Sequence, residues 1–307
     1  MTALTLAAHL VALTVLPVVF VGVVNRTKAL WAGRKGPPLL QVAFDLAKLL
    51  RKRSVYSGVT TEIFSAGPLL ALATTMVSWM VVPVFARPGP VSLPYDFVAL
   101  AYAWGLGRFA MVLAALDTGS SFEGMGASRE ATFAALVEPV FFLVFGSLAL
   151  ATGARSMDAL LRVDPSTPSG VALAVAVVVA LAVVLATESA RIPVDDPTTH
   201  LELTMIHEVM VLDHAGPELA AAQLGAAIKL TACAAMIATV VNPARHLPIV
   251  GAVVNVGLVL LLAVVVGCVE ALATRVKLRV VAQFVLAGAV AALVALLSAA
   301  WSVGGAQ

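Results

Sequence analysis

The stretch from Glu188 to Glu218 gathers ionisable side chains between two long apolar segments. Of the 17 acidic residues in the chain, seven lie in it, and three histidines accompany them. Ionisable groups held against a bilayer are costly to desolvate, so a cluster of them indicates a functional site. Carboxylates at close range raise one another's pKa, and burial acts in the same direction, so such a group can hold and pass protons near neutral pH. The chemistry that this pattern favours is proton transfer.

A second acidic stretch runs from Asp117 to Glu138, where four more carboxylates fall. Its glycines permit a close approach of the backbone to a neighbouring segment. Ser128 fits the N-cap of a helix, with Glu130 in the first turn facing the helix dipole. Glu138 precedes Pro139 inside an apolar run, where a glutamate needs a partner. A structural ion pair is the alternative to a proton-carrying role for Glu138.

Two cations also stand inside apolar runs, Arg108 and Lys229. A charge at the middle of a bilayer costs about 2.5–3.5 kcal/mol on insertion scales unless it is paired or hydrated. Lys229 therefore needs an acid or water nearby, and we count it among the proton-relay candidates. Arg108 has the alternative of extending its side chain to the interface. Glu270 is expected to pair with Arg275 or Lys277 at the membrane surface.

The segment between Asp196 and Gly216 is predicted to form a short helix. Asp196 suits the N-cap, Pro197 the first helical position, and Gly216 the end of the helix. Zinc-binding helices place two histidines four residues apart, whereas these histidines are spaced by seven, which argues against a metal site. Polar packing is the ordinary alternative for them. The three are His200, His207 and His214.

Composition places the chain in a membrane. Of its 307 residues, 61% are hydrophobic and 12% are charged, about half the charged fraction of a soluble domain. The net charge of +2 gives no reason to expect a nucleic-acid partner. We therefore predict an all-α, polytopic membrane protein with about eight transmembrane helices, forming one domain over residues 1–307. The expected spans are Leu4–Val24, Ile63–Phe85, Tyr95–Leu116, Ala131–Gly153, Val171–Leu185, Leu219–Val241, Ile249–Leu272 and Val280–Trp301.

Two cysteines cannot supply four thiolate ligands, so this chain by itself holds neither a four-cysteine iron–sulfur cluster nor a nickel–iron centre of that kind. Any such redox chemistry is expected in another subunit. The first apolar run, Leu4–Val24, has no basic residue before it and is long enough to span. We expect it to be a retained helix rather than a signal peptide.

Basic residues are concentrated in alternate loops, above all between residues 26 and 53. By the positive-inside rule this places that loop in the cytoplasm and both termini outside it, in a plasma (inner) membrane. Within the loop, a basic turn from Trp31 to Pro38 cannot continue a helix. Leu39–Leu50 then places its apolar residues on one face, which predicts an amphipathic helix at the cytoplasmic interface. That helix either lies on the membrane surface or forms part of a docking surface for a partner.

Several short motifs carry a resemblance to a known family. They are Arg34-Lys35-Gly36-Pro37, Asp45 with Lys48-Leu49-Leu50, Glu123-Gly124-Met125-Gly126-Ala127-Ser128-Arg129-Glu130, Glu138-Pro139, and Glu188 with Arg191-Ile192-Pro193-Val194-Asp195-Asp196. Over about residues 25–280 the chain resembles the membrane "subunit 1" family of NADH:quinone oxidoreductase. The run Asp195–Glu208 looks like the formate-hydrogenlyase branch, the membrane subunits of group 4 nickel–iron hydrogenases.

The resemblance implies a non-catalytic membrane anchor that docks hydrogenase-like large and small subunits. It also implies iron–sulfur proteins and antiporter-like membrane subunits as partners, with the nickel–iron centre and the iron–sulfur clusters held in partner subunits. Together with Lys229, the proton-relay candidates are Glu123, Glu138, Asp195, Asp196, Glu202, Glu208 and Asp213. The residues that the resemblance implies for partner docking are Arg34, Gly36, Pro37, Asp45, Lys48, Arg129 and Arg191.

Two other functions compete with this one. The first is a quinone-binding subunit of an NADH dehydrogenase-type complex. Val194, Thr198 and His200 depart from that branch's pattern, while Glu202 keeps to it. The second is a proton-coupled secondary transporter, which would show two related halves with interrupted helices at the midplane. The charges here lie in loops on one side instead, which favours the subunit.

Overall fold

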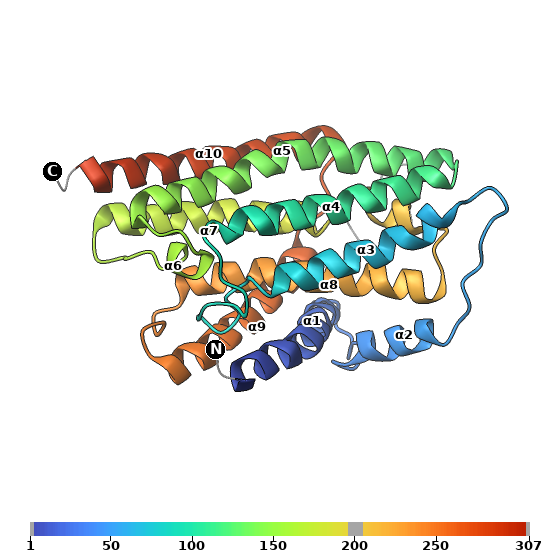
Figure 1. The fold of residues 1–307 in the computed structure, drawn as a ribbon, viewed down its shortest axis with the longest axis horizontal. Helices are drawn as coiled ribbons and strands as arrows, with labels where there is room; N and C mark the ends of the chain where they lie inside the picture. Colours follow the sequence, from blue (N-terminus) through green and yellow to red (C-terminus); the bar gives the residue numbers. More distant parts are fainter. Residues whose placement is uncertain (1–2, 196–204, 305–307) are drawn as a thin grey trace.

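The computed structural model describes residues 3–195 and 205–304, and every regular element in these ranges is helical. Figure 1 shows long helices that lie side by side along one direction, joined at the two ends of the bundle. The elements are α1 (Ala3–Trp31), α2 (Gln41–Leu50), α3 (Glu62–Trp79), α4 (Asp96–Asp117), α5 (Ser121–Thr152), α6 (Met157–Leu160), α7 (Pro168–Glu188), the 3-10 helix η1 (Glu208–Val211), α8 (Gly216–Val241), α9 (Pro248–Leu272) and α10 (Leu278–Gly304).

Seven of the described helices are long and apolar enough to cross a membrane: α1, α4, α5, α7, α8, α9 and α10. The all-α polytopic architecture predicted from composition is therefore confirmed. The eighth expected span, Ile63–Phe85, corresponds to α3, an 18-residue helix that packs along α4 and α8 and is not among the seven. Helix α3 ends at Trp79, and the chain that follows is irregular as far as Tyr95.

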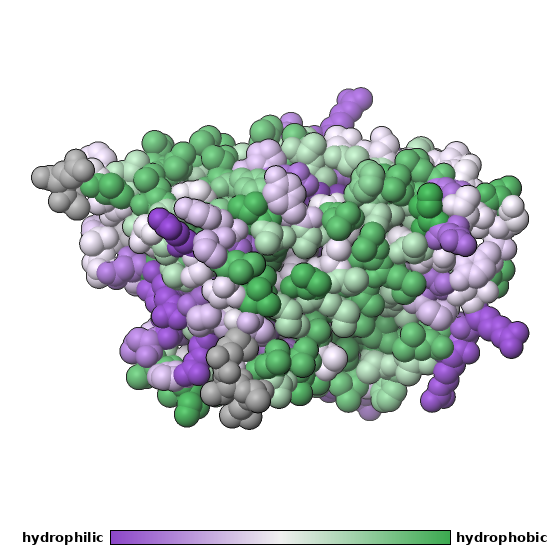
Figure 2. Space-filling view, viewed as in Figure 1, coloured by the Kyte–Doolittle hydropathy of each residue, from purple (hydrophilic) through white to green (hydrophobic). Residues whose placement is uncertain are grey.

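Helix α8 forms the centre of the bundle, and its residues from Leu230 to Val240 are all buried. Its many alanines and glycines let neighbouring helices approach closely, as is usual where helices pack in a membrane. Helices α9 and α10 instead leave long apolar faces exposed. On the face of the molecule seen in Figure 2, hydrophobic residues cover much of the surface and hydrophilic ones lie mostly toward the two ends. Lys229, in the middle of α8, is therefore enclosed by protein.

Two predicted helix boundaries were wrong. Helix α5 begins at Ser121, so Ser128 lies inside a helix and is not its N-cap. The turn is made earlier, at Gly119, whose φ of 67° suits glycine. Gly216 and Pro217 begin α8 instead of ending the preceding segment. A proline in the first turn lacks an N–H that would have no partner there, so the same residues that stop one helix can start another.

The amphipathic helix predicted after the basic turn is confirmed as α2. None of its residues is fully buried; Val42, Leu46 and Leu49 are half-buried, while Phe44 and Leu50 are exposed. The turn before it depends on Gly36, which has a φ of 70°. A Cβ at Gly36 would also lie 2.8 Å from the Ala29 Cβ, so the position is closed to other residues both by conformation and by space.

Candidate functional site

Five ionisable side chains from four helices meet in the bundle, four of them largely buried and one, Glu138, half-exposed, and we call them the buried ion cluster. Arg108 comes from the middle of α4, Glu130 and Glu138 from α5, Glu188 from the last residue of α7, and Lys229 from the middle of α8. Residues far apart in the sequence are thus brought together by helix packing alone.

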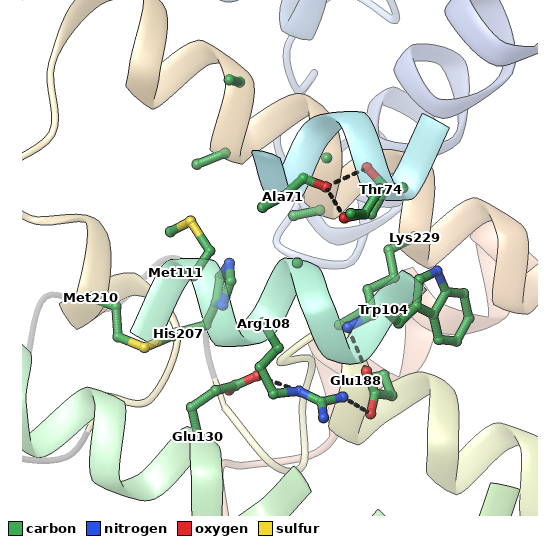
Figure 3. Close-up of a pocket in the computed structure, with 17 residues that line it drawn as sticks. Ala71, Thr74, Trp104, Arg108, Met111, Glu130, Glu188, His207, Met210 and Lys229 are labelled. Atoms are coloured by element: carbon green, nitrogen blue, oxygen red, sulfur yellow. Dashed lines mark hydrogen bonds and ion pairs between the residues drawn. The ribbon is translucent and has the colours of Figure 1, made fainter. Parts of the chain in front are cut away.

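Arg108 is the hub of the cluster. Its Nη1 lies 2.5 Å from Glu138 Oε1, its Nη2 2.5 Å from Glu188 Oε1, and its Nε 3.4 Å from Glu130 Oε1. Lys229 pairs with the other oxygen of Glu188, and its Nζ lies 5.3 Å from the centroid of the Trp104 ring. Figure 3 shows Glu188 between the two cations. Arg108 is therefore paired inside the bundle and does not extend to the interface.

A cavity lies beside the cluster between α3, α4 and α8. The cavity volume that is open to the centres of water-sized molecules is about 60 Å³. One water needs roughly 10–15 Å³ of such volume, so the cavity has room for several waters. Small residues of the three helices create the space, and Figure 3 shows the charged side chains along one side of it. The polar and ionisable side chains of its lining are Thr74, Thr75, Trp104, Arg108, Glu130, Glu188, Ser189, His207 and Lys229.

The segment 205–215 covers the cavity and is held in place by buried side chains. Asp195 Oδ2 accepts hydrogen bonds from the backbone N–H of Ile206 at 2.8 Å and of His207 at 3.3 Å. Asp195 Oδ1 lies 3.0 Å from Arg275 Nη2. Asp195 thereby positions the histidine that lines the cavity.

Two residues of α5 hold the same segment. The buried Glu123 accepts a hydrogen bond from the backbone N–H of Asp213 at 3.1 Å, and Arg129 donates to the Met205 carbonyl at 2.7 Å. Glu123 and Asp195 were predicted as relay residues, and the structure gives both a positioning contact. Their relay role stays a prediction.

The remaining relay candidates fall at different depths. Lys229 and Glu138 belong to the cluster, Glu208 is half-buried at the start of η1, and the Asp213 side chain is exposed. Asp196 and Glu202 lie outside the described residues, as does His200. Of the two acids that complete the cluster, Glu188 and Glu130, neither was among the predicted relay residues. Their signal was the pair of cations within apolar spans, because a charge there is costly unless it is paired or hydrated.

The docking candidates divide into two groups. Arg34, Gly36, Asp45 and Lys48 are exposed around the turn before α2, and Pro37 is half-buried beside them. Arg129 and Arg191 instead face inward.

Arg191 makes its contact at a second buried acid. Arg191 Nη1 lies 3.2 Å from Glu270 Oε1, and Lys28 Nζ lies 3.0 Å from Glu270 Oε2. The expected pairing of Glu270 with Arg275 or Lys277 was wrong, because Arg275 is used by Asp195 and the fold brings α1 and Arg191 to Glu270.

Within the described ranges, no group of three or more His, Cys, Asp and Glu side chains could hold a metal ion. The two cysteines, Cys233 and Cys268, are not joined in a disulfide. The ionisable groups of the cluster are arranged in ion pairs.

His214 gives a testable pH dependence. Burial lowers its pKa, its Nε2 lies 3.1 Å from the Phe64 carbonyl, and its ring stacks on Phe64. Protonation of His214 is therefore harder in the folded protein than in the unfolded chain, which takes up a proton near the ordinary pKa of about 6.5. The stability that neutral His214 contributes is complete above the unfolded pKa of about 6.5. It is lost as the pH falls from there through the lower pKa of the folded protein. We expect His214→Gln to reduce the loss of stability between about pH 8 and pH 5.5.

The measurement is equilibrium unfolding of the purified protein in mixed micelles at both pH values. His246, which is exposed, supplies the control, and His246→Gln should leave the pH dependence as it is. An equal pH dependence in the His214 variant and the wild-type protein would contradict the assignment.

Known membrane proteins are similar to this chain in sequence. The sequence profile described as NADH dehydrogenase matches residues 4–301. Hydrogenase-4 component C of Escherichia coli (strain K12) is 30% identical over 239 residues, which cover 77% of this chain and 74% of that protein. Formate hydrogenlyase subunit 4 of the same organism is 31% identical over 137 residues, 45% of each chain.

A solved structure shares the fold. One chain of the membrane-bound sulfane sulfur reductase, described as an archaeal respiratory membrane complex, superposes with a TM-score of 0.78 over 96% of this chain and 98% of that one. The two sequences are 20% identical. The likeness therefore concerns the arrangement of the helices.

Proposed function

Because this chain belongs to the NADH dehydrogenase subunit 1 family, we propose that it is the membrane anchor and proton-relay subunit of a hydrogenase-like, formate hydrogenlyase-type respiratory complex. The observation that carries the proposal is the buried ion cluster with its adjoining cavity. Relatives with the printed names hydrogenase-4 component C and formate hydrogenlyase subunit 4 support the choice of complex.

The charge balance of the cluster favours proton exchange. Three carboxylates face two cations, so one negative charge is left over when all five groups are ionised. In this proposal the surplus carboxylate is the group that takes up and releases the proton. His207 and Glu130 line the same cavity, which has room for water to join them to Glu188. In this proposal, protons pass between Glu130, His207 and Glu188 through water in the cavity.

The exposed side chain of Glu138 is an argument for a neighbouring membrane subunit. It lies in the middle of α5 with 48% of its side chain exposed, although α5 is one of the helices that can span. One of its oxygens pairs with Arg108, but the exposed part of the carboxylate is costly against lipid at that depth, whereas a polar group of a partner can satisfy it. We assign this side of α5 to an antiporter-like membrane subunit, which would receive protons from the cluster.

The exposed surface around Arg34, Asp45 and Lys48 is the proposed docking site for hydrogenase-like large and small subunits and for iron–sulfur proteins. Its basic turn and amphipathic helix lie at one end of the bundle (Figure 1). Redox centres, a nickel–iron site and iron–sulfur clusters, would then belong to those partners. By the distribution of basic residues, this end faces the cytoplasm and the two termini lie on the other side of the plasma membrane.

Glu130→Gln tests the relay. The amide keeps the size of the side chain and a hydrogen bond to Arg108 but cannot carry the proton. In the whole complex reconstituted into vesicles, we expect electron transfer to continue while redox-driven proton movement across the membrane is largely lost. The readouts are the redox rate and a pH-sensitive dye inside the vesicles.

Glu62→Gln is the matched control, because Glu62 is exposed in the first turn of α3, outside the cluster. It should leave both rates unchanged. Full proton movement in the Glu130 variant would refute the relay, and failure of the complex to assemble would make Glu130 structural.

A further inference from the structure

We propose that a groove between the first turns of α1 and α9 is a specific site for an anionic phospholipid of the surrounding bilayer. The phosphate would lie at Arg87 and the start of α9, and one acyl chain would lie along the apolar walls. This site is separate from the buried ion cluster, with which it shares no lining residue.

Three segments form the groove. Their lining residues are Thr5, Ala8 and His9 of α1, Phe85, Arg87 and Pro88 of the chain after α3, and Pro248, Ile249, Ala252 and Val253 of α9. The groove volume that is open to the centres of water-sized molecules is about 460 Å³, far more than the volume of the interior cavity on the same measure. Most of its lining is apolar and belongs to the outer faces of helices that can span. A hydrocarbon chain is the occupant that such walls favour.

The polar end of the groove is positive. Of the described residues that line it, none is acidic, and Arg87 is the one arginine or lysine. Arg87 is exposed, and neither a hydrogen bond nor an ion pair is seen for its side chain within the described part of the chain. Because its guanidinium presents several donors in one plane, it suits the oxygens of a phosphate.

The start of α9 adds to this charge. No side chain caps its first turn, and Pro248 occupies one of the opening positions. The free N–H groups of a first turn and the helix dipole both attract an anion. The arginine and the uncapped helix start attract the negative charge of an anionic phospholipid, and the apolar groove suits its acyl chain. A zwitterionic phospholipid carries no net negative charge, so this site attracts it less.

The wall that carries Arg87 is fixed before any lipid binds. His9 Nε2 lies 3.1 Å from the Val82 carbonyl, and Asn255 Nδ2 donates to the Val84 carbonyl at 2.8 Å. The His9 ring also contacts the edge of Phe85. Contacts from α1 and α9 thus hold the irregular chain between them, so binding need not order it.

The test is native mass spectrometry of the purified complex, titrated with phosphatidylglycerol and, separately, with phosphatidylcholine of the same acyl chains. The wild-type complex should bind phosphatidylglycerol more tightly. Arg87→Gln should weaken phosphatidylglycerol about tenfold, as expected when a hydrogen-bonded charge is removed, and bring the two lipids close to equality. Ala252→Trp, which fills the groove, should weaken both.

Arg155→Gln is the matched control, because Arg155 is exposed and lies outside the groove. It should bind as the wild-type complex does. Equal binding of the two lipids by the wild-type complex, or unchanged phosphatidylglycerol binding in the Arg87 variant, would overturn the proposal. So would a partner helix cross-linked into the groove. Should Ala252→Trp fail to fold, the Arg87 comparison decides alone, and none of these readouts depends on proton transfer.

Discussion

Replacing Glu188 with glutamine is expected to lower the free energy of unfolding by about 3–5 kcal/mol, because Lys229 then stays buried without its carboxylate. The Glu188 side chain is 6% exposed and contacts two cations at once. After the change, Arg108 keeps Glu130 and Glu138, whereas Lys229 keeps no carboxylate among the partners described for it, only the neutral amide oxygen of the new glutamine and the face of Trp104. The penalty arises from the orphaned ammonium group more than from the lost attraction.

Equilibrium unfolding in mixed micelles, followed by tryptophan fluorescence, measures the loss. Glu188→Gln combined with Lys229→Met should recover most of it, because the double variant removes the unpaired charge as well. Asp45→Asn, at an exposed position of α2, should shift stability by no more than about 0.5 kcal/mol. A Glu188 variant as stable as the wild-type protein would show that the pair is not desolvated as the structure has it.

Gly126→Ala is expected to displace the segment that carries His207 and to cost about 1–3 kcal/mol by overpacking. A Cβ at Gly126 would lie 2.3 Å from Val209 Cγ1 and 3.0 Å from the Ile206 carbonyl oxygen. Helix α5 and the 3-10 helix would have to separate. Since His207 lines the cavity, proton movement by the reconstituted complex should fall with stability.

Gly124→Ala is the control for that change, because the two glycines lie on the same helix and a Cβ at Gly124 meets nothing within 4 Å. Alanine in an open helical position is favoured over glycine by roughly 0.5–1 kcal/mol. The two variants should therefore shift stability in opposite directions. Protease accessibility of residues 205–215, raised in the Gly126 variant alone, would locate the disturbance, and equal behaviour of the two variants would contradict the packing.

The α5 glycines show how far a local pattern reaches. They were expected to permit a close backbone approach, which Gly126 makes, yet the helix was expected to begin at Ser128 and begins at Ser121. Local residue preferences leave that choice open, because a sequence that suits a cap also suits a helix interior when tertiary contacts stabilise the longer helix. Gly216 and Pro217 are ambiguous for the same reason, since they fit both the end and the start of a helix.

The sequence by itself determined the membrane class, the positions of the apolar helices, the amphipathic α2 and the cost of leaving Arg108 and Lys229 unpaired and unhydrated. These properties follow from hydrophobic periodicity and from the cost of an unpaired charge in lipid. Neither depends on which residues become neighbours in the folded structure. Only the tertiary structure decided which acids are those partners, because Glu130 and Glu188 are brought to Arg108 by the packing of α4, α5 and α7. It also gave Asp195 and Glu123 their backbone contacts, since pairing between distant segments depends on three-dimensional distance and not on spacing along the chain.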